Sequence, residues 1–158
     1  MSLHVPPSPP TLDFALELRV DIGPPLEVGS LSCGMRRTIP ILGGVFSGPR
    51  IAGRVLPGGA DWQFTDSDGL TELDAHYLIE TDDGVRIEVR NKGIRCGSPE
   101  VLARIASGES VPPRDYYFRT TPRFYPPKGK YDWLRQAVFV GVCERYPDLV
   151  FVGVWKLF

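Results

Sequence analysis

The sequence has few of the side chains that bind metals or build nucleophilic catalytic triads. It contains three cysteines and two histidines in 158 residues. Cys33, Cys96 and Cys143 are odd in number and widely spaced, without a Cys-x-x-Cys pair, which argues against a disulfide framework and against a zinc site. We therefore expect three free thiols, no bound metal and no cofactor.

The two histidines offer little for catalysis. His4 lies in the proline-rich start of the chain, so a Ser-His-Asp or Cys-His triad would have to use His76. Alternation of apolar and polar residues places His76 on the solvent face of its strand, together with Asp74. An exposed histidine is therefore the preferred interpretation.

Excess charge and long apolar runs are also missing. The formal net charge is −1 and no long block of like charge occurs, whereas nucleic acid and anionic lipid select a basic patch. The longest strongly apolar run, Val138 to Cys143, is far shorter than the roughly 20 residues that span a bilayer. The sequence predicts no nucleic-acid partner, no membrane partner and a cytoplasmic location.

Glycine and proline, by contrast, are abundant, with 17 and 16 residues. Both residue types break helices and mark turns, so a folded chain of this composition is expected to contain many short strands. The hydrophobic share of 42% and the charged share of 23% are those of a globular domain. We expect a disordered or tag-derived tail over residues 1–11 and one domain over residues 12–158.

Alternating patterns predict most of the strands. From Leu12 to Ile22 every even-numbered residue is hydrophobic and most odd-numbered residues are charged, as in a half-buried strand. Pro40 indicates a sheet edge, residues 122–130 indicate a loop, and the apolar run from Val138 to Val142 favours burial on both faces. Further strands are expected over 26–31, 37–42, 50–56, 115–120, 136–145 and 149–157, with a hairpin over 71–91.

The register of that hairpin follows from residue parity, because the odd-numbered residues are apolar on both arms. A three-residue loop over 82–84, with its glycine left-handed, pairs Ile79 with Ile87. A two-residue loop would instead place a charged residue opposite Ile79. Tyr77 and Asn91 should therefore share the buried face.

One short helix is also expected, with Ser98 as N-cap, Pro99 at its first position and Gly108 beyond its end. With about eight to ten strands, the chain is expected to be mainly β and to form a closed antiparallel barrel of the calycin or lipocalin type. Such a barrel would hold an internal pocket.

The segment from Gly58 to Phe64 carries the main candidate site. If it is a strand, Asp61 and Gln63 project to one face and Trp62 and Phe64 to the other. In one interpretation Asp61 is a proton acceptor at the barrel mouth, with its pKa raised by desolvation. In the other, the aromatic rings belong to the core and Asp61 only caps a turn.

Arg119 and Trp133 are further candidates because each lies among aromatic and cationic residues. Such mixing suits an anionic or aromatic ligand through charge-assisted hydrogen bonds and stacking. It equally suits solvated cations around a folded loop.

Seven short motifs are distributed along the chain: Arg37 to Pro49, Gly53 to Gln63, Leu73 to Tyr77, Thr81 to Gly84, Asn91-x-Gly93, Tyr117 to Arg119 and Tyr131-x-Trp133-Leu134. Together they resemble domain-of-unknown-function family 3237, also called uncharacterised protein family 0311. The resemblance covers nearly the whole chain after the tail and implies a calycin-like barrel. It implies no common activity, although some fungal relatives look like pathway enzymes that close rings on small aromatic metabolites. His76 stands where the family more often has arginine.

Three functional hypotheses remain open at this point. The first is a cofactor-independent isomerase, lyase or cyclase acting on a small aromatic or carbonyl compound, and it requires its polar residues to converge on one pocket. The second is a non-catalytic barrel that binds or carries a small metabolite. The third is an assembly module that forms a homodimer or higher homo-oligomer. In the first hypothesis Asp61 is the general base, Tyr77 or Arg119 stabilises negative charge, and Gln63, Asn91, Trp62 and Trp133 contact the substrate.

Overall fold

The computed structural model describes residues 5–158, so the first four residues of the expected tail lie outside the described part. Within it the chain forms ten strands, one α-helix and two short 3-10 helices. The helices are α1 (Pro99–Ala106), η1 (Pro113–Asp115) and η2 (Asp132–Leu134). The strands are β1 (Leu12–Ile22), β2 (Leu26–Leu31), β3 (Gly34–Ser47), β4 (Ala52–Val55), β5 (Ala60–Asp66), β6 (Thr71–Thr81), β7 (Arg86–Gly97), β8 (Tyr116–Tyr125), β9 (Phe139–Arg145) and β10 (Leu149–Leu157).

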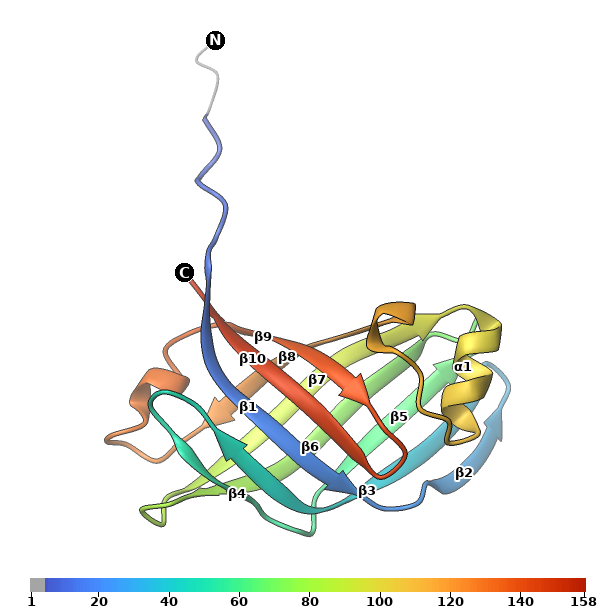
Figure 1. The fold of residues 1–158 in the computed structure, drawn as a ribbon, viewed down its shortest axis with the longest axis horizontal. Coiled ribbons are helices and arrows are strands. Elements are labelled where there is room, and N and C mark those ends of the chain that lie inside the picture. Colours follow the sequence, from blue (N-terminus) through green and yellow to red (C-terminus); the bar gives the residue numbers. More distant parts are fainter. Residues whose placement is uncertain (1–4) are drawn as a thin grey trace.

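The strands close into an antiparallel barrel, as predicted (Figure 1). Around the ring the order is β1, β10, β9, β8, β7, β6 and β3, with β4 and β5 sharing the place between β6 and β3. Pairing of β1 with β3 completes the ring of eight strand positions. β2 pairs only with β3 and extends beyond the ring.

A bulge in β1 changes which of its residues face the core. The pairing of β1 with β10 shifts between Phe14 and Leu16, so the inward and outward sides exchange there. Leu16 is completely buried, whereas Leu12 and Phe14 are about half exposed. The strand prediction over residues 12–22 is confirmed, but the expected burial of Leu12 and Phe14 is wrong because one extra residue reverses the parity.

The strand expected over 37–42 is part of a longer one, because β3 continues through Gly43 and Gly44 to Ser47. Gly43 and Gly44 have φ angles of +145° and +140°, and the pairing of β1 with β3 shifts at this point. The shift falls between Ile41 and Gly43, so Leu42 and Gly43 form a bulge inside a continuous strand, while Gly44 pairs in regular register with Val20. A Cβ on Gly44 would lie 2.0 Å from the carbonyl oxygen of Arg19, so only glycine permits this close approach of β3 to β1.

The hairpin of β6 and β7 has the predicted register. Ile79 lies opposite Ile87, Tyr77 opposite Val89 and Ala75 opposite Asn91. The loop closes through a hydrogen bond from the Thr81 N–H to the Val85 carbonyl oxygen, and Gly84 has a φ of +85°. Matching apolar faces thus select the three-residue loop.

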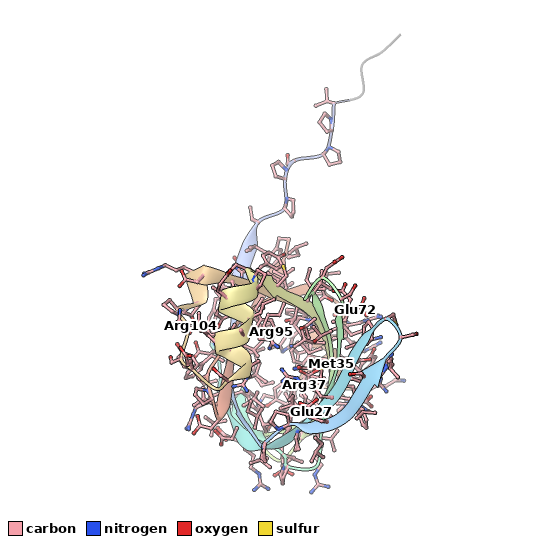
Figure 2. The ribbon with its side chains drawn as sticks, turned by 90° about the vertical axis from the view of Figure 1, so that its right-hand side faces the viewer. Glu27, Met35, Arg37, Glu72, Arg95 and Arg104 are labelled. Atoms are coloured by element: carbon pink, nitrogen blue, oxygen red, sulfur yellow. The ribbon has the colours of Figure 1, made fainter. Side chains whose placement is uncertain are left out.

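The helix is also found where it was predicted. The Ser98 hydroxyl accepts a hydrogen bond from the backbone N–H of Val101, Pro99 begins α1, and Gly108 follows with a φ of +84°. Viewed along the barrel, α1 lies at one side of the opening at one end (Figure 2). No helix within residues 5–158 is long and apolar enough to cross a membrane.

Two expectations about the last strands need correction. β8 continues to Tyr125, so part of the expected loop over 122–130 is strand. Pro122 is tolerated in β8 because the pairing with β9 is confined to Arg119 and Thr120, so no backbone N–H is needed at Pro122 on the β9 side. β9 is not buried on both faces, because only its alternate residues Phe139, Gly141 and Cys143 are buried. Val140 and Val142 are half-buried. Val138, just before the strand, is 64% exposed.

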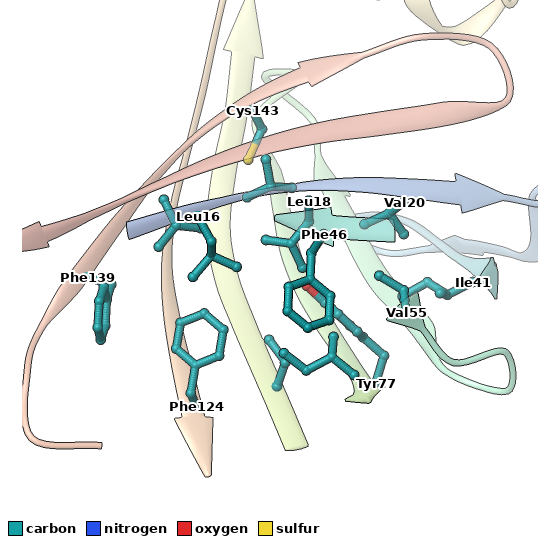
Figure 3. Packing of buried hydrophobic residues seen from close by; sticks show 14 of the residues in the cluster. Leu16, Leu18, Val20, Ile41, Phe46, Val55, Tyr77, Phe124, Phe139 and Cys143 are labelled. Carbon is teal, nitrogen blue, oxygen red and sulfur yellow. The ribbon is translucent and has the colours of Figure 1, made fainter. Parts of the chain in front are cut away.

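The apolar core fills the end of the barrel opposite α1. Leu16, Ile79, Ile87 and Val89 are completely buried there, and the rings of Phe124 and Phe139 meet edge to face at 5.4 Å. Figure 3 shows this packing, with Tyr77 and Cys143 at its border. The interior toward α1 is left for other side chains.

The bulge in β3 gives a stability prediction with a matched control. Gly44→Ala should lower the free energy of unfolding by more than Gly43→Ala. Both positions have a similar positive φ, but only at Gly44 would the new Cβ clash with a backbone oxygen. A Cβ on Gly43 would lie at an ordinary 3.6 Å from the Val55 carbonyl oxygen. We expect about 1–2 kcal/mol for Gly43→Ala and clearly more for Gly44→Ala in urea unfolding. Equal losses would contradict this close approach.

Candidate functional site

An internal cavity of about 60 Å³ lies between the apolar core and the barrel end beside α1. That volume holds a few water molecules or part of a small organic ligand. Its wall combines aliphatic residues with a group of polar side chains. The polar or ionisable residues of the wall are Asp61, Gln63, Tyr77, Asn91, Arg95, Thr120, Cys143 and Arg145.

Strand register brings the predicted residues together. Asp61 lies opposite Ala75, and Ala75 lies opposite Asn91, so the three form one row across β5, β6 and β7. The small side chain of Ala75 leaves the space between Asp61 and Asn91 open. Tyr77 is two residues along β6 from Ala75 and therefore points to the same interior face.

The two interpretations of the segment around Asp61 are thereby distinguished. Gln63 is buried and lines the cavity with Asp61, whereas Trp62 is 58% exposed on the outer face. Phe64 is also on that side, beneath the guanidinium of Arg36 at 5.0 Å from its ring centroid. The carboxylate thus faces inward and does not merely cap a turn.

Asp61 is held by two hydrogen bonds in a partly buried position. Its Oδ2 accepts from Nε2 of Gln63 at 2.7 Å, and its Oδ1 accepts from the backbone N–H of Asp74 at 3.0 Å. Burial raises the pKa of Asp61 above its ordinary value, and these two hydrogen bonds only partly counteract that effect. The result is a carboxylate more basic than one in water.

Gln63 connects Asp61 to an arginine. Its Oε1 accepts a hydrogen bond from Nε of Arg37 at 3.0 Å, while its Nε2 donates to Asp61. Because both ends of the amide are engaged, its orientation is fixed. Gln63 therefore positions the carboxylate, a different role from the substrate contact expected from the sequence.

Tyr77 and Cys143 are the neutral groups of the cavity. Burial raises the pKa of Tyr77 well above its ordinary value, and burial likewise raises the pKa of Cys143 to about 12. The negative charge of Asp61 adds to both effects. At neutral pH the Tyr77 hydroxyl therefore keeps its proton and can donate a hydrogen bond.

Asn91 is 6% exposed, and its side-chain oxygen has no hydrogen-bond partner among the described residues. A buried acceptor left unpaired costs roughly 1–3 kcal/mol. This oxygen lies in a cavity wall, where a ligand or a water molecule would supply a donor.

Arg119, Trp62 and Trp133 lie outside the cavity. The expected convergence on one pocket is therefore wrong for Arg119, and the two tryptophans, expected to contact a substrate, do not line this cavity. Arg119 is on the outer face of β8, where its Nη1 donates to the Phe118 carbonyl oxygen and its guanidinium stacks on the Tyr117 ring. The strand phase gives the inward positions to Phe118 and Thr120 instead. Trp62 is outward as described, and Trp133 is in η2, packed on Phe139 and covered by Arg50.

The sequence reasoning missed an arginine cluster, Arg37, Arg95 and Arg145, at the α1 end of the cavity. Arg95 is 3% exposed, and burial together with the charges of Arg37 and Arg145 lowers its pKa to about 10. Burial and the charge of Arg37 also lower the pKa of Arg145. Parity could have revealed Arg95, because it is odd-numbered on the same strand as Asn91.

His76 is outward, as predicted. Its Nε2 lies 2.9 Å from Oε1 of Glu88, and its side chain is 42% exposed. It therefore has no part in the cavity.

Fold and site define a class: a small closed antiparallel barrel whose internal cavity combines an apolar wall with one carboxylate, a phenol, amides and arginines. Residues 10–157 match the family described as "Protein of unknown function (DUF3237)", and the chain belongs to this family. The resemblance inferred from the motifs is thus confirmed.

Relatives support both the family and the fold. A UPF0311 protein of Rhodopseudomonas palustris is 44% identical over 150 residues, which cover 94% of this chain and 98% of the relative. A crystal structure of a protein of unknown function from that organism has a TM-score of 0.91 at 42% identity, covering 96% of this chain and 100% of the other. A hydroalkoxylation enzyme of Penicillium herquei is 25% identical over 151 residues, which cover 96% of this chain and 86% of the enzyme. A crystal structure of an enzyme from Penicillium herquei shares the fold, with a TM-score of 0.75 at 24% identity, covering 99% of this chain and 100% of the other.

The raised pKa of Asp61 predicts how stability depends on pH. Between the ordinary carboxyl pKa of 3.8 and the higher value in the folded state, the folded protein binds more protons than the unfolded chain, so stability falls as the pH rises. Asp61→Asn removes this loss. The stability of wild type minus that of the variant should therefore decrease above pH 3.8. The total decrease is about 1.4 kcal/mol for each unit by which folding raises the pKa of Asp61.

Chemical denaturation of both proteins across this pH range measures the difference directly. Asp13→Asn, at an exposed position of β1, is the matched control and should run parallel to wild type. A wild-type advantage that grows with pH would show that the hydrogen bonds to Asp61 outweigh its burial.

Proposed function

We propose that this protein is a cofactor-independent enzyme that moves a proton within a small aromatic or carbonyl compound, as an isomerase, lyase or cyclase does. The observation that carries the proposal is the placement of a basic carboxylate, Asp61, and a protonated phenol, Tyr77, in the wall of one internal cavity. Binding alone requires an apolar lining and one or two anchors, but not an acid and a base together.

Asp61 is the general base in this proposal. Its pKa is raised by burial, which increases its affinity for a proton, and both of its oxygens are held in place by donors. A base that is already oriented loses little entropy when the substrate arrives. After accepting the proton, the same carboxyl acts as an acid and returns it to another atom of the substrate.

Tyr77 stabilises the negative charge that develops when the proton leaves. Its hydroxyl is neutral at physiological pH, so it donates a hydrogen bond to an enolate or phenolate oxygen without repelling it. The sequence left this stabilising role open between Tyr77 and Arg119, and we assign it to Tyr77. Asn91 orients the substrate through its unpaired oxygen, which accepts from a hydroxyl group.

Hydroalkoxylation, the activity for which the Penicillium herquei relative is named, also requires one proton to be removed and one to be added. In that reaction an alcohol adds across a carbon–carbon double bond: the oxygen loses its proton and bonds to one carbon, and the other carbon gains a proton. One carboxyl group that first accepts and then donates balances both transfers, and no oxidant or reductant is consumed. This relation supports acid–base chemistry and leaves the substrate of this protein open.

Proton transfer to carbon can be measured without knowing the natural substrate. The purified protein is incubated in D₂O with ortho-alkenylphenols and aryl ketones, and deuterium at carbon is followed by NMR. We expect Asp61→Asn to lower the rate of incorporation by about 10²–10⁴-fold and Tyr77→Phe to lower it less, while Asp13→Asn retains the wild-type rate.

Two outcomes would contradict the proposal. If Asp61→Asn incorporated deuterium as fast as wild type, Asp61 would not be the base. If wild type bound the alkenylphenols or aryl ketones but incorporated no deuterium into them, the protein would be a carrier instead.

A further inference from the structure

The arginine cluster has no adequate countercharge among the described residues. None of the ion pairs within residues 5–158 includes Arg37, Arg95 or Arg145. Asp61 attracts Arg95, but no hydrogen bond or ion pair joins the two side chains, and the hydrogen bonds that Asp61 accepts come from Gln63 and the backbone of Asp74. Removing like charges from water without compensation is unfavourable, so this arrangement favours an anion from outside the chain.

Other acidic side chains near the cluster do not change this conclusion. Asp148 attracts Arg145, but it is exposed in the turn after β9. Glu27 lies on β2 opposite Arg37 in the strand register, but it too is exposed. Both carboxylates are solvated, whereas Arg95 is deep in the barrel.

A second observation points independently to a ligand. Nε of Arg95 is buried and has no hydrogen-bond partner among the described residues, and the same is true of Oδ1 of Asn91. Both residues lie on the inward face of β7, with Gly93 between them. A donor and an acceptor, both unpaired on one wall, match a ligand that carries an anionic group and a hydroxyl group.

The cluster lies where an outer groove meets the inner cavity. The groove has a volume of about 370 Å³ and runs between α1 and the strands β2 and β3. Arg37 and Arg95 line the groove, whereas Arg95 and Arg145 line the cavity. Figure 2 shows Arg37 and Arg95 inside the barrel end beside α1. Arg95 therefore belongs to both spaces.

We propose that this cavity binds a small organic anion, with its carboxylate on the arginine cluster and its apolar body directed toward Tyr77. Guanidinium groups present paired N–H donors that match the two oxygens of a carboxylate. The aliphatic wall, including Val20 and Ile41, accommodates the apolar part. The inference names the substrate class of the site and rests on the proposed function only for the claim that the bound anion reacts.

A pair of nearly isosteric probes tests the anion preference. The dissociation constants of 4-hydroxybenzoate and 4-hydroxybenzamide are measured by NMR titration at neutral pH. For wild type we expect the carboxylate to bind at least about tenfold more tightly, since charge-assisted hydrogen bonds are worth more than neutral ones. Arg95→Met and Arg145→Gln should each bring this ratio close to one. Arg119→Gln, which removes an arginine from the outer face, should keep the wild-type ratio.

The test separates this inference from the proposed function. The inference would be overturned if wild type bound the two probes with equal affinity, or bound neither at millimolar concentration. It would also be overturned if Arg95→Met and Arg145→Gln both kept the wild-type preference for the carboxylate. Asp61→Asn should keep the carboxylate preference. If deuterium incorporation failed while the preference persisted, only the proposed proton transfer would be contradicted.

Discussion

The pairing of β1 with β3 is the constraint on which the rest of the structure depends. It joins the ends of a long antiparallel sheet, and it requires the backbone of β3 to approach β1 at Gly44 more closely than a side chain would permit. Once the sheet is closed, alternation divides every strand into an inward and an outward set. Asp61, Tyr77 and Asn91 then face one interior although they come from three different strands.

The two ends of this interior differ in their energetic roles. Completely buried aliphatic side chains such as Leu16, Ile79 and Ile87 each contribute roughly 1.5–3 kcal/mol. Burial of a charge such as Arg95 costs several kcal/mol when its partners are incomplete. A few well-packed aliphatic residues therefore offset the polar end. Destabilising buried charges next to a cavity are expected to serve ligand binding or catalysis.

Residue parity in the sequence was sufficient for part of the site and failed for the rest for identifiable reasons. It placed Tyr77 and Asn91 correctly because the loop after β6 leaves a single register that matches the apolar faces. The same parity extends to Arg95, but the predicted hairpin ended at Asn91, whereas β7 continues to Gly97, so Arg95 was not assigned to a strand. Arg119 was misplaced because its assignment rested on neighbouring aromatic residues rather than on strand phase.

Other features depend on contacts between distant segments and could not be read locally. The bulge in β1 that exposes Phe14 is set by pairing with β10. The continuity of β3 through Gly43 and Gly44 depends on pairing with β1, which precedes it in the chain, and with β4, which follows it. The hydrogen bond from Arg37 to Gln63 joins residues that are 26 positions apart, so no local pattern predicts it.

The central claim is that an inward-facing carboxylate, Asp61, is made more basic by burial in the barrel. Carbon-13 NMR titration of the aspartate carboxyl groups, with the Asp61 resonance assigned from the Asp61→Asn variant, tests this claim most directly. The account predicts a pKa for Asp61 above the ordinary value of 3.8. A pKa at or below 3.8 would contradict it, because Asp61 would then be an ionised hydrogen-bond acceptor with no enhanced basicity.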